Sequence, residues 1–381
     1  MKIPKSLRTA LKIFAVVLGF GCLLVAGGIG GALLLRSQVQ RYNADVGRII
    51  TPHGIDEAQY VNLGGVRQWI TVRGMDRRQP ILLYLHGGPG GAISDVSYTF
   101  QRPWEDYFTV VHWDQRGFGR SAVDSDKIRS VTKDQLVADA IELIELLRHR
   151  YGQPKIILVG QSFGTVLGAT VAHLRPDLLY AYVGLAQVTG WQSIFEESRE
   201  TMMANARSSG DTRLLHDLEQ IGPPPRGNAH TFMPWADKVQ AVAFAHGHFW
   251  YNATGTWDVT SRVLVWYLYS PTLPLRQMFS RMVGGGKREV FDVDSVMDWD
   301  FRKDLGLDFQ VPMIFVSGAH DLTTPVESVK RLESELRAPY KSMTVLDHSS
   351  HVLVLEEPGR LLEALVHEAL PFANGAAKGG T

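Results

Sequence analysis

The pentapeptide Gly160-Gln161-Ser162-Phe163-Gly164 places a serine between two glycines. An apolar run, 155–159, comes directly before it, and a stretch with helical character, 165–174, follows. A sharp turn from strand to helix needs small residues on both sides, and it lifts the serine hydroxyl clear of the sheet. This context favours Ser162 as the nucleophile of acyl transfer over an idle serine in a glycine-rich turn.

A second glycine-rich segment, 86–91 (HGGPGG), follows the apolar run 80–85. Acyl transfer needs backbone N–H donors aimed at a developing oxyanion, and glycines let the backbone approach closely. We predict the amides of Gly88 and Phe163 as these donors, with Gly87 as the alternative to Gly88. A nucleotide-phosphate loop is disfavoured because neither G-x-G-x-x-G nor Gly-Lys-Ser/Thr occurs here.

A serine nucleophile needs a base and an acid. Where the serine lies on such a strand–turn–helix, the chain order is serine, acid, histidine. His351 comes just after the last apolar run, 342–346, and Asp321 follows the run 312–316. We predict His351 as the base and Asp321 as the acid. The alternatives are one histidine and five aspartates: His348, Asp347, Asp292, Asp294, Asp298 and Asp300.

The elements that must position these residues alternate between strand and helix. A hairpin with a Gly64-Gly65 turn is predicted first, followed by six short, continuous apolar runs at 80–85, 108–113, 155–159, 180–185, 312–316 and 342–346. Such runs are typical of strands covered on both faces, which indicates an α/β fold with a mostly parallel sheet flanked by helices. Residues 188–305 break the alternation and are predicted to form a helical cap.

The chain has 381 residues, with 39 basic and 39 acidic side chains and one cysteine. The charge is unevenly distributed, since residues 1–41 carry a net +6 and the remainder a net −6. A mildly acidic body without a basic run argues against a nucleic-acid partner.

The pair His246 and His248 lacks a third ligand, so no metal is predicted, and the chemistry requires no cofactor.

The 23 residues from Ile13 to Leu35 carry no charge and would form a helix roughly 34 Å long, enough to cross a bilayer. Basic residues flank this run and predict a cytoplasmic N-terminus with the catalytic part on the outer face. A cleaved signal peptide and a buried soluble helix are the alternatives. The predicted parts are therefore an anchor at 1–36, a linker at 37–55, a core at 56–187 and 306–373, a cap at 188–305 and a disordered tail at 374–381.

Taken together, these motifs resemble the alpha/beta-hydrolase family and, within it, the proline iminopeptidase-like serine hydrolases. HGGPGG, the segment 114–121 (DQRGFGRS) and GQSFG match that group in order and spacing, as do Gly318–Asp321 and His351 with Glu356 and Pro358. The resemblance implies the same triad and oxyanion hole over roughly residues 57–370. In DQRG we expect Asp114 and Arg116 to form an ion pair that braces the loop.

The substrate is where the sequence leaves two hypotheses open. The resemblance implies release of an N-terminal residue, most simply proline, from a peptide whose ammonium group is bound by acidic cap residues. Glu196, Glu197 and Glu200 are the predicted candidates, although their helical spacing also fits a solvated helix face. A carboxylesterase acting on small acyl esters would use the same triad.

Overall fold

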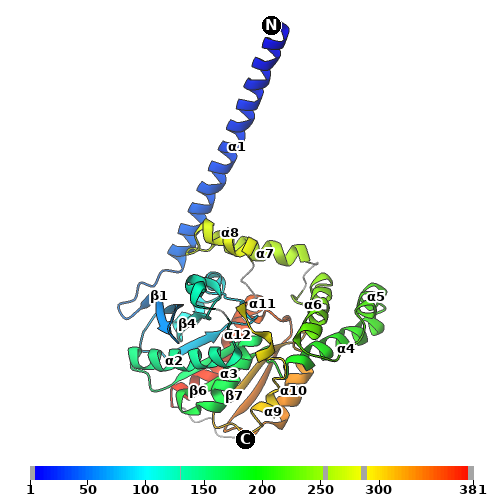
Figure 1. Ribbon diagram of the computed structural model, residues 1–381. Helices are drawn as coiled ribbons and strands as arrows, with labels where there is room; N and C mark the ends of the chain where they lie inside the picture. The colour runs from blue at the N-terminus through cyan, green and yellow to red at the C-terminus, as the bar shows by residue number, and fades with distance from the viewer. Residues whose placement is uncertain (1–4, 129, 252–255, 285–289, 376–381) are drawn as a thin grey trace.

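The computed structural model describes residues 5–128, 130–251, 256–284 and 290–375, and shows a long N-terminal helix standing on an α/β body (Figure 1). The body contains a sheet of eight strands. They are β1 (Ile55–Leu63), β2 (Val66–Gly74), β3 (Ile81–Leu85), β4 (Thr109–Asp114), β5 (Ile156–Gln161), β6 (Leu179–Leu185), β7 (Met313–Gly318) and β8 (Lys341–Leu346).

The strand order is β1-β2-β4-β3-β5-β6-β7-β8. The β1–β2 hairpin is antiparallel and pairs antiparallel with β4, while every neighbouring pair from β4 through β8 is parallel. Gly64 and Gly65 form the hairpin turn with φ of 52° and 79°, a region in which a side chain is disfavoured. The predicted mostly parallel α/β sheet is confirmed, and the carboxyl ends of β3, β5, β7 and β8 meet at one edge.

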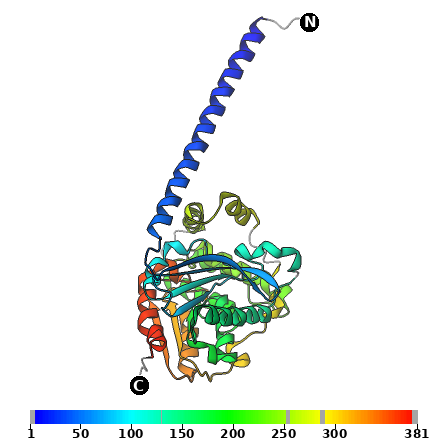
Figure 2. The ribbon, with the colours of Figure 1, turned by 90° about the vertical axis from the view of Figure 1, so that its left-hand side faces the viewer.

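Helices cover both faces of the sheet (Figure 2). One face carries α2 (Lys133–Tyr151), α3 (Phe163–Leu174) and α10 (Val326–Glu335). The other face carries α11 (Leu353–Glu356), α12 (Pro358–Ala364), a π turn at Leu365–Ala369 and α13 (Leu370–Ala373). The fully buried strands therefore separate two apolar layers.

Between β6 and β7 the described elements are all helical. The longer ones are α4 (Trp191–Ser209), α5 (Thr212–Ile221), α6 (Ala229–Ala245), α7 (Thr256–Tyr269) and α8 (Leu275–Gly284), and a short α9 (Phe301–Asp304) precedes β7. In both ribbon views α7 and α8 lie on the side of the body from which the N-terminal helix rises (Figures 1 and 2).

The N-terminal helix α1 runs from Lys5 to Val46, so the first ten residues of the predicted linker at 37–55 are helical. These residues contain neither glycine nor proline, and the helix ends only before Gly47. The part of α1 that could span a membrane lies within Leu18–Val46, where an 18-residue apolar window has a mean hydropathy of 2.1 and no buried residue. The predicted disordered tail lies outside the described residues from 376 onward.

Candidate active site

Ser162 lies on the turn that joins the end of β5 to the start of α3. Its φ is 52°, a strained value for a residue with a side chain. A Cβ on Gly160 would come within 2.5 Å of the Gly164 carbonyl oxygen, and one on Gly164 within 2.1 Å of the Leu85 carbonyl oxygen. The two flanking glycines are therefore required sterically, as the sequence pattern indicates.

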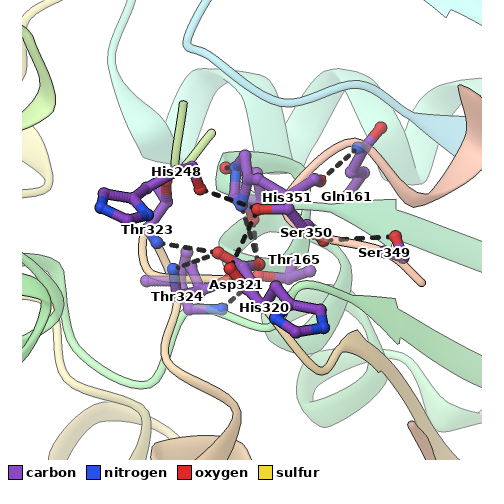
Figure 3. A network of polar contacts seen from close by, with 12 residues as sticks. Gln161, Thr165, His248, His320, Asp321, Thr323, Thr324, Ser349, Ser350 and His351 are labelled. Atoms are coloured by element: carbon purple, nitrogen blue, oxygen red, sulfur yellow. Dashed lines mark hydrogen bonds and ion pairs between the residues drawn. The ribbon is translucent and has the colours of Figure 1, made fainter. Parts of the chain in front are cut away.

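His351 connects Ser162 to Asp321, as Figure 3 shows for the histidine and the aspartate. The His351 Nε2 atom lies 3.1 Å from the Ser162 Oγ, and the Nδ1 atom lies 2.9 Å from the Asp321 Oδ2. With its proton on Nδ1, the ring can accept the hydroxyl proton of Ser162 at Nε2. The structure thus brings together the three residues that the sequence singled out.

Asp321 is only 1% exposed, and three donors besides His351 satisfy its carboxylate. The backbone N–H groups of Thr323 and Thr324 donate to Oδ1 at 2.8 and 2.9 Å, and the Thr324 hydroxyl donates to Oδ2 at 2.7 Å. These hydrogen bonds satisfy the buried carboxylate and fix the direction in which it faces His351.

The alternative acids and base occupy other positions. Asp292 and Asp300 accept backbone N–H bonds at helix starts, and Asp294, Asp298 and Asp347 are exposed. His348 is also exposed, and its Nδ1 lies 3.4 Å from the Tyr251 hydroxyl. The geometry of the triad therefore uses none of them.

Of the two segments predicted to supply oxyanion donors, Phe163 follows Ser162 directly and the glycine loop approaches Ser162 through Gly87. Phe163 is the first residue of α3, where backbone N–H groups have no partner within the helix. Gly88 has a φ of 118°, and its neighbour Gly87 packs so closely that a Cβ there would lie 2.9 Å from the Ser162 Cβ. The Gly91 N–H donates to the Gly87 carbonyl at 2.9 Å, which closes the loop into a tight turn.

His86 positions this loop, a role that sequence reasoning missed. Its Nδ1 donates to the Gly87 carbonyl at 2.9 Å, and its Nε2 accepts from the Gln115 N–H at 3.2 Å. Complete burial lowers the pKa of His86 to about 4, so the ring remains neutral and keeps this donor–acceptor arrangement. The sequence signal for this role was the presence of both the HGG and the DQRG motif, because the His86 ring links the two loops that carry them.

The DQRG segment braces the structure with a partner other than the predicted one. Arg116 forms a buried bidentate ion pair with Asp139 of α2, with both N–O distances 2.7 Å, and it also donates to the Leu63 and Gly64 carbonyls. Asp114 instead accepts the Arg120 N–H at 2.7 Å. The expected pair between Asp114 and Arg116 is wrong, because the Arg116 side chain faces α2 while the Asp114 carboxylate faces the backbone of Arg120.

The loop that carries His351 is held by Glu356. The Glu356 Oε2 accepts from the Ser349 hydroxyl and the Ser350 N–H, each at 2.8 Å, while its Oε1 accepts from the Tyr251 N–H of the cap. Burial raises the pKa of Glu356. The Gln161 side chain adds a 3.3 Å bond to the His351 carbonyl (Figure 3).

The cap supplies an aromatic neighbour to the triad, since the Phe249 ring centroid lies 5.1 Å from that of His351.

The predicted glutamates lie on α4. Glu197 pairs with Arg331 of α10 at 2.9 Å and accepts from Ser328, Glu200 is exposed, and Glu196 is half-buried. Burial and then the charges of Glu200 and Glu197 raise the pKa of Glu196. An amine-binding role for these residues stays a prediction.

No cluster of three or more potential metal-ligating side chains occurs among the described residues. His246 of the histidine pair instead lies 2.8 Å from the Asp217 carboxylate through its Nε2 atom. The arrangement as a whole can perform nucleophilic attack, proton transfer and oxyanion stabilisation on an acyl carbonyl.

Comparison with known proteins assigns the class. The family model for the alpha/beta hydrolase fold matches residues 80–358, so the chain belongs to the alpha/beta hydrolase family. Among curated relatives it is similar to the probable aminopeptidase YbaC of Bacillus subtilis (strain 168), with 29% identity over 311 residues that cover 81% of this chain and 95% of that protein.

A proline iminopeptidase of Saccharolobus solfataricus is 24% identical over 318 residues, which cover 77% of this chain and 85% of the relative. Among solved structures, a membrane phospholipase A described as a bacterial virulence factor superposes with a TM-score of 0.51. At 16% identity, over 96% of this chain and 99% of that one, this likeness shows the fold alone. The family and its hydrolase fold are thereby established.

Proposed function

We propose that the chain is a membrane-anchored serine hydrolase that releases an N-terminal residue, most simply proline, from peptides. One observation carries the proposal, namely the continuous hydrogen-bonded series from the Ser162 Oγ through His351 to the Asp321 carboxylate, at 3.1 and 2.9 Å. The similarity to a probable aminopeptidase over nearly its whole length supports the peptide substrate. The exposed apolar part of α1 supports the anchor, with its basic N-terminus on the cytoplasmic side.

In the proposed reaction the Ser162 Oγ attacks the substrate carbonyl carbon, and His351 takes the hydroxyl proton at Nε2. The carbonyl oxygen becomes an oxyanion, which the Gly88 and Phe163 amides stabilise at the positive end of α3. His351 then gives its proton to the leaving amine as the C–N bond breaks. Water, deprotonated by His351, hydrolyses the acyl-enzyme, while Asp321 stabilises the imidazolium in both halves.

A carboxylesterase is the second candidate, and the surroundings of the site favour it in one respect. A substrate ammonium must be met by a carboxylate when it is desolvated. Glu197 is already paired with Arg331, and the neighbour of His351 from the cap is the apolar Phe249. An ester needs no such carboxylate, because its leaving group and acyl chain carry no charge.

The test measures hydrolysis of a prolyl-amide and of a short-chain ester by the full chain in detergent. Ser162→Ala is expected to reduce turnover of both by several orders of magnitude while the fold is retained. Ser193→Ala, a serine on α4 of the cap, is the matched control and should keep its activity. Near-normal turnover by Ser162→Ala contradicts the serine mechanism, and an unmutated protein that cleaves only the ester selects the second candidate.

A further inference from the structure

The end of α1 is fastened to the cap by three side chains that recur on one helix face. Arg36 donates from Nη2 to the Leu273 carbonyl at 2.7 Å, Gln40 donates from Nε2 to the Ser270 carbonyl at 2.5 Å, and Asn43 donates from Nδ2 to the Tyr269 carbonyl at 2.9 Å. Their spacing of four and three residues places all three on the same side of the helix. We call this set the α1 clasp.

The acceptors of the α1 clasp lie at the end of α7 and in the turn that leads to α8. The last carbonyls of a helix have no partner within it, so side chains from α1 satisfy groups that would otherwise need water. The body holds both the turn and α7, because Arg120 donates to the Thr272 carbonyl at 2.7 Å and Tyr98 donates to the Trp266 carbonyl of α7 at 2.9 Å. The α7–α8 hairpin is therefore bound to both the anchor helix and the hydrolase body.

The α1 clasp also fixes the level of the hairpin relative to a membrane. Arg36 is the first charged residue after the uncharged run that ends at Leu35, so it marks the boundary between hydrocarbon and water. A residue at that boundary is directly hydrogen-bonded to Leu273, between α7 and α8. Both ribbon views place the two helices across the anchor side of the body (Figures 1 and 2).

The composition of the hairpin suits a lipid surface. The α7–α8 hairpin, 256–284, contains three arginines against one acidic residue, Asp258, which pairs with Arg262 at 2.9 Å and leaves a net charge of +2. Val265 on α7 and Phe279 on α8 are 48% and 53% exposed, although both are large apolar side chains. Basic residues combined with exposed apolar ones are typical of helices that lie in the membrane interface and bind acidic lipids.

We infer that the α7–α8 hairpin is a membrane-binding surface, held by the α1 clasp at the headgroup level of an acidic bilayer. The inference rests on the proposed anchoring of α1. It adds that the cap over the active site itself touches lipid, with Phe279 at the headgroup boundary.

The experiment uses the full chain in vesicles of phosphatidylethanolamine and phosphatidylglycerol, with an environment-sensitive fluorophore on a single cysteine. The native Cys22 reports on the anchor. Phe279→Cys reports on the hairpin, and Ser334→Cys, an exposed position on α10, is the control for the body, both in a Cys22→Ser background. Nitroxide-labelled lipids quench only labels that reach the bilayer.

Strong quenching is expected at 22, and a loss of roughly half or more of the emission at 279, because interfacial helices sit about 5–10 Å into the headgroup boundary. The label at 334 should lose almost none. If 22 is quenched while 279 behaves like 334, the inference is wrong and the anchor stands. If 22 is not quenched, the proposed anchoring fails and the inference fails with it.

A second set of variants tests the α1 clasp. Replacing Arg36, Gln40 and Asn43 by alanine should move the quenching at 279 toward the value at 334 without changing that at 22. Gln38→Ala with Arg41→Ala alters two exposed α1 residues instead and should leave the quenching at 279 intact. Unchanged quenching in the triple variant would show that the hairpin reaches lipid without the clasp, which overturns that part of the inference.

Discussion

The strand ends that hold the triad and the helices that cover it position their acidic groups in different ways. In the core, Asp321 is buried and accepts hydrogen bonds from two backbone amides and two side chains. In the cap, Glu197 forms a surface ion pair with Arg331, and Glu200 is exposed. Local backbone geometry thus fixes the candidate acid of the triad, whereas the carboxylates that could select a substrate depend on packing between helices.

The largest expected effect is on kcat and comes from changing the buried acid of the core. Asp321→Asn should lower kcat by about 10⁴-fold, because the amide can no longer hold the reactive tautomer of His351 or stabilise its cation. Asp347→Asn, which changes the exposed aspartate next along the chain, should leave kcat within about twofold of the unmutated value, as is usual for surface substitutions. Steady-state kinetics on one prolyl-amide and one ester measure both, and a strong loss in Asp347→Asn alone would reverse the assignment of the acid.

A smaller effect is expected from the cap, and it should depend on the substrate. If a glutamate of α4 binds the substrate ammonium, its change to glutamine should raise KM for the prolyl-amide about 100-fold or more, since an unpaired buried charge costs about 3–5 kcal/mol. Glu196 is expected to carry this loss, because Glu197 is paired elsewhere and Glu200 is exposed.

The ester is the internal control for that measurement, and its KM should change little. Glu219→Gln, an exposed glutamate on α5, is the matched control variant. Equal losses on both substrates, or none in any of the three α4 variants, would mean that these carboxylates do not bind an amine and would favour the esterase.

The smallest expected effect is on the free energy of unfolding, and it concerns a buried histidine of the core sheet. Burial lowers the pKa of His112 on β4 from 6.5 to about 3, so the folded protein keeps this ring neutral where the unfolded chain protonates it. The free energy of unfolding should therefore fall as pH decreases from about 6.5, by about 1.4 kcal/mol per pH unit from this group.

His112→Phe should remove that contribution to the slope, because phenylalanine binds no proton. Urea unfolding of the full chain in detergent, at two pH values inside this window, measures the difference. His216→Phe, an exposed position on α5, should keep the slope of the unmutated protein. If His112→Phe keeps the same slope as well, this ring already titrates in the folded state.

The sequence predicted the strands and the three residues that form the triad geometry, because each of these residues follows an apolar run whose end lies at a common sheet edge. The caps of α2 also depend only on residues close in the sequence. Thr132 accepts the Gln135 N–H at 3.2 Å at the start of α2, and Gly152 ends that helix with a φ of 64°. The steric need for glycine on both sides of Ser162 is likewise indicated by the pentapeptide 160–164 alone.

Features that depend on distant partners were not predictable in this way. The acceptor of Arg36 lies 237 residues along the chain, so nothing near residues 37–46 indicated that this part of the helix would dock on the cap. Arg116 pairs with Asp139 on α2 and not with Asp114, which is only two residues away in the sequence. The C-terminal helical segment from Pro358 to Ala373 is interrupted by a π turn at Leu365–Ala369, two residues before Pro371, which lacks the N–H that a regular helix would use.

If the chain is anchored as proposed, the uninterrupted helix from Lys5 to Val46 also determines how the protein would search for its substrate. A flexible tether of 19 residues would let the body wander over a root-mean-square distance of about 24 Å. With α1 in a membrane as proposed, a stiff rod bonded to the body would remove that freedom and keep Ser162 at a constant height above the bilayer. Encounters then become a two-dimensional problem, in which lateral diffusion of enzyme and substrate within one lipid sheet replaces collision from bulk solution.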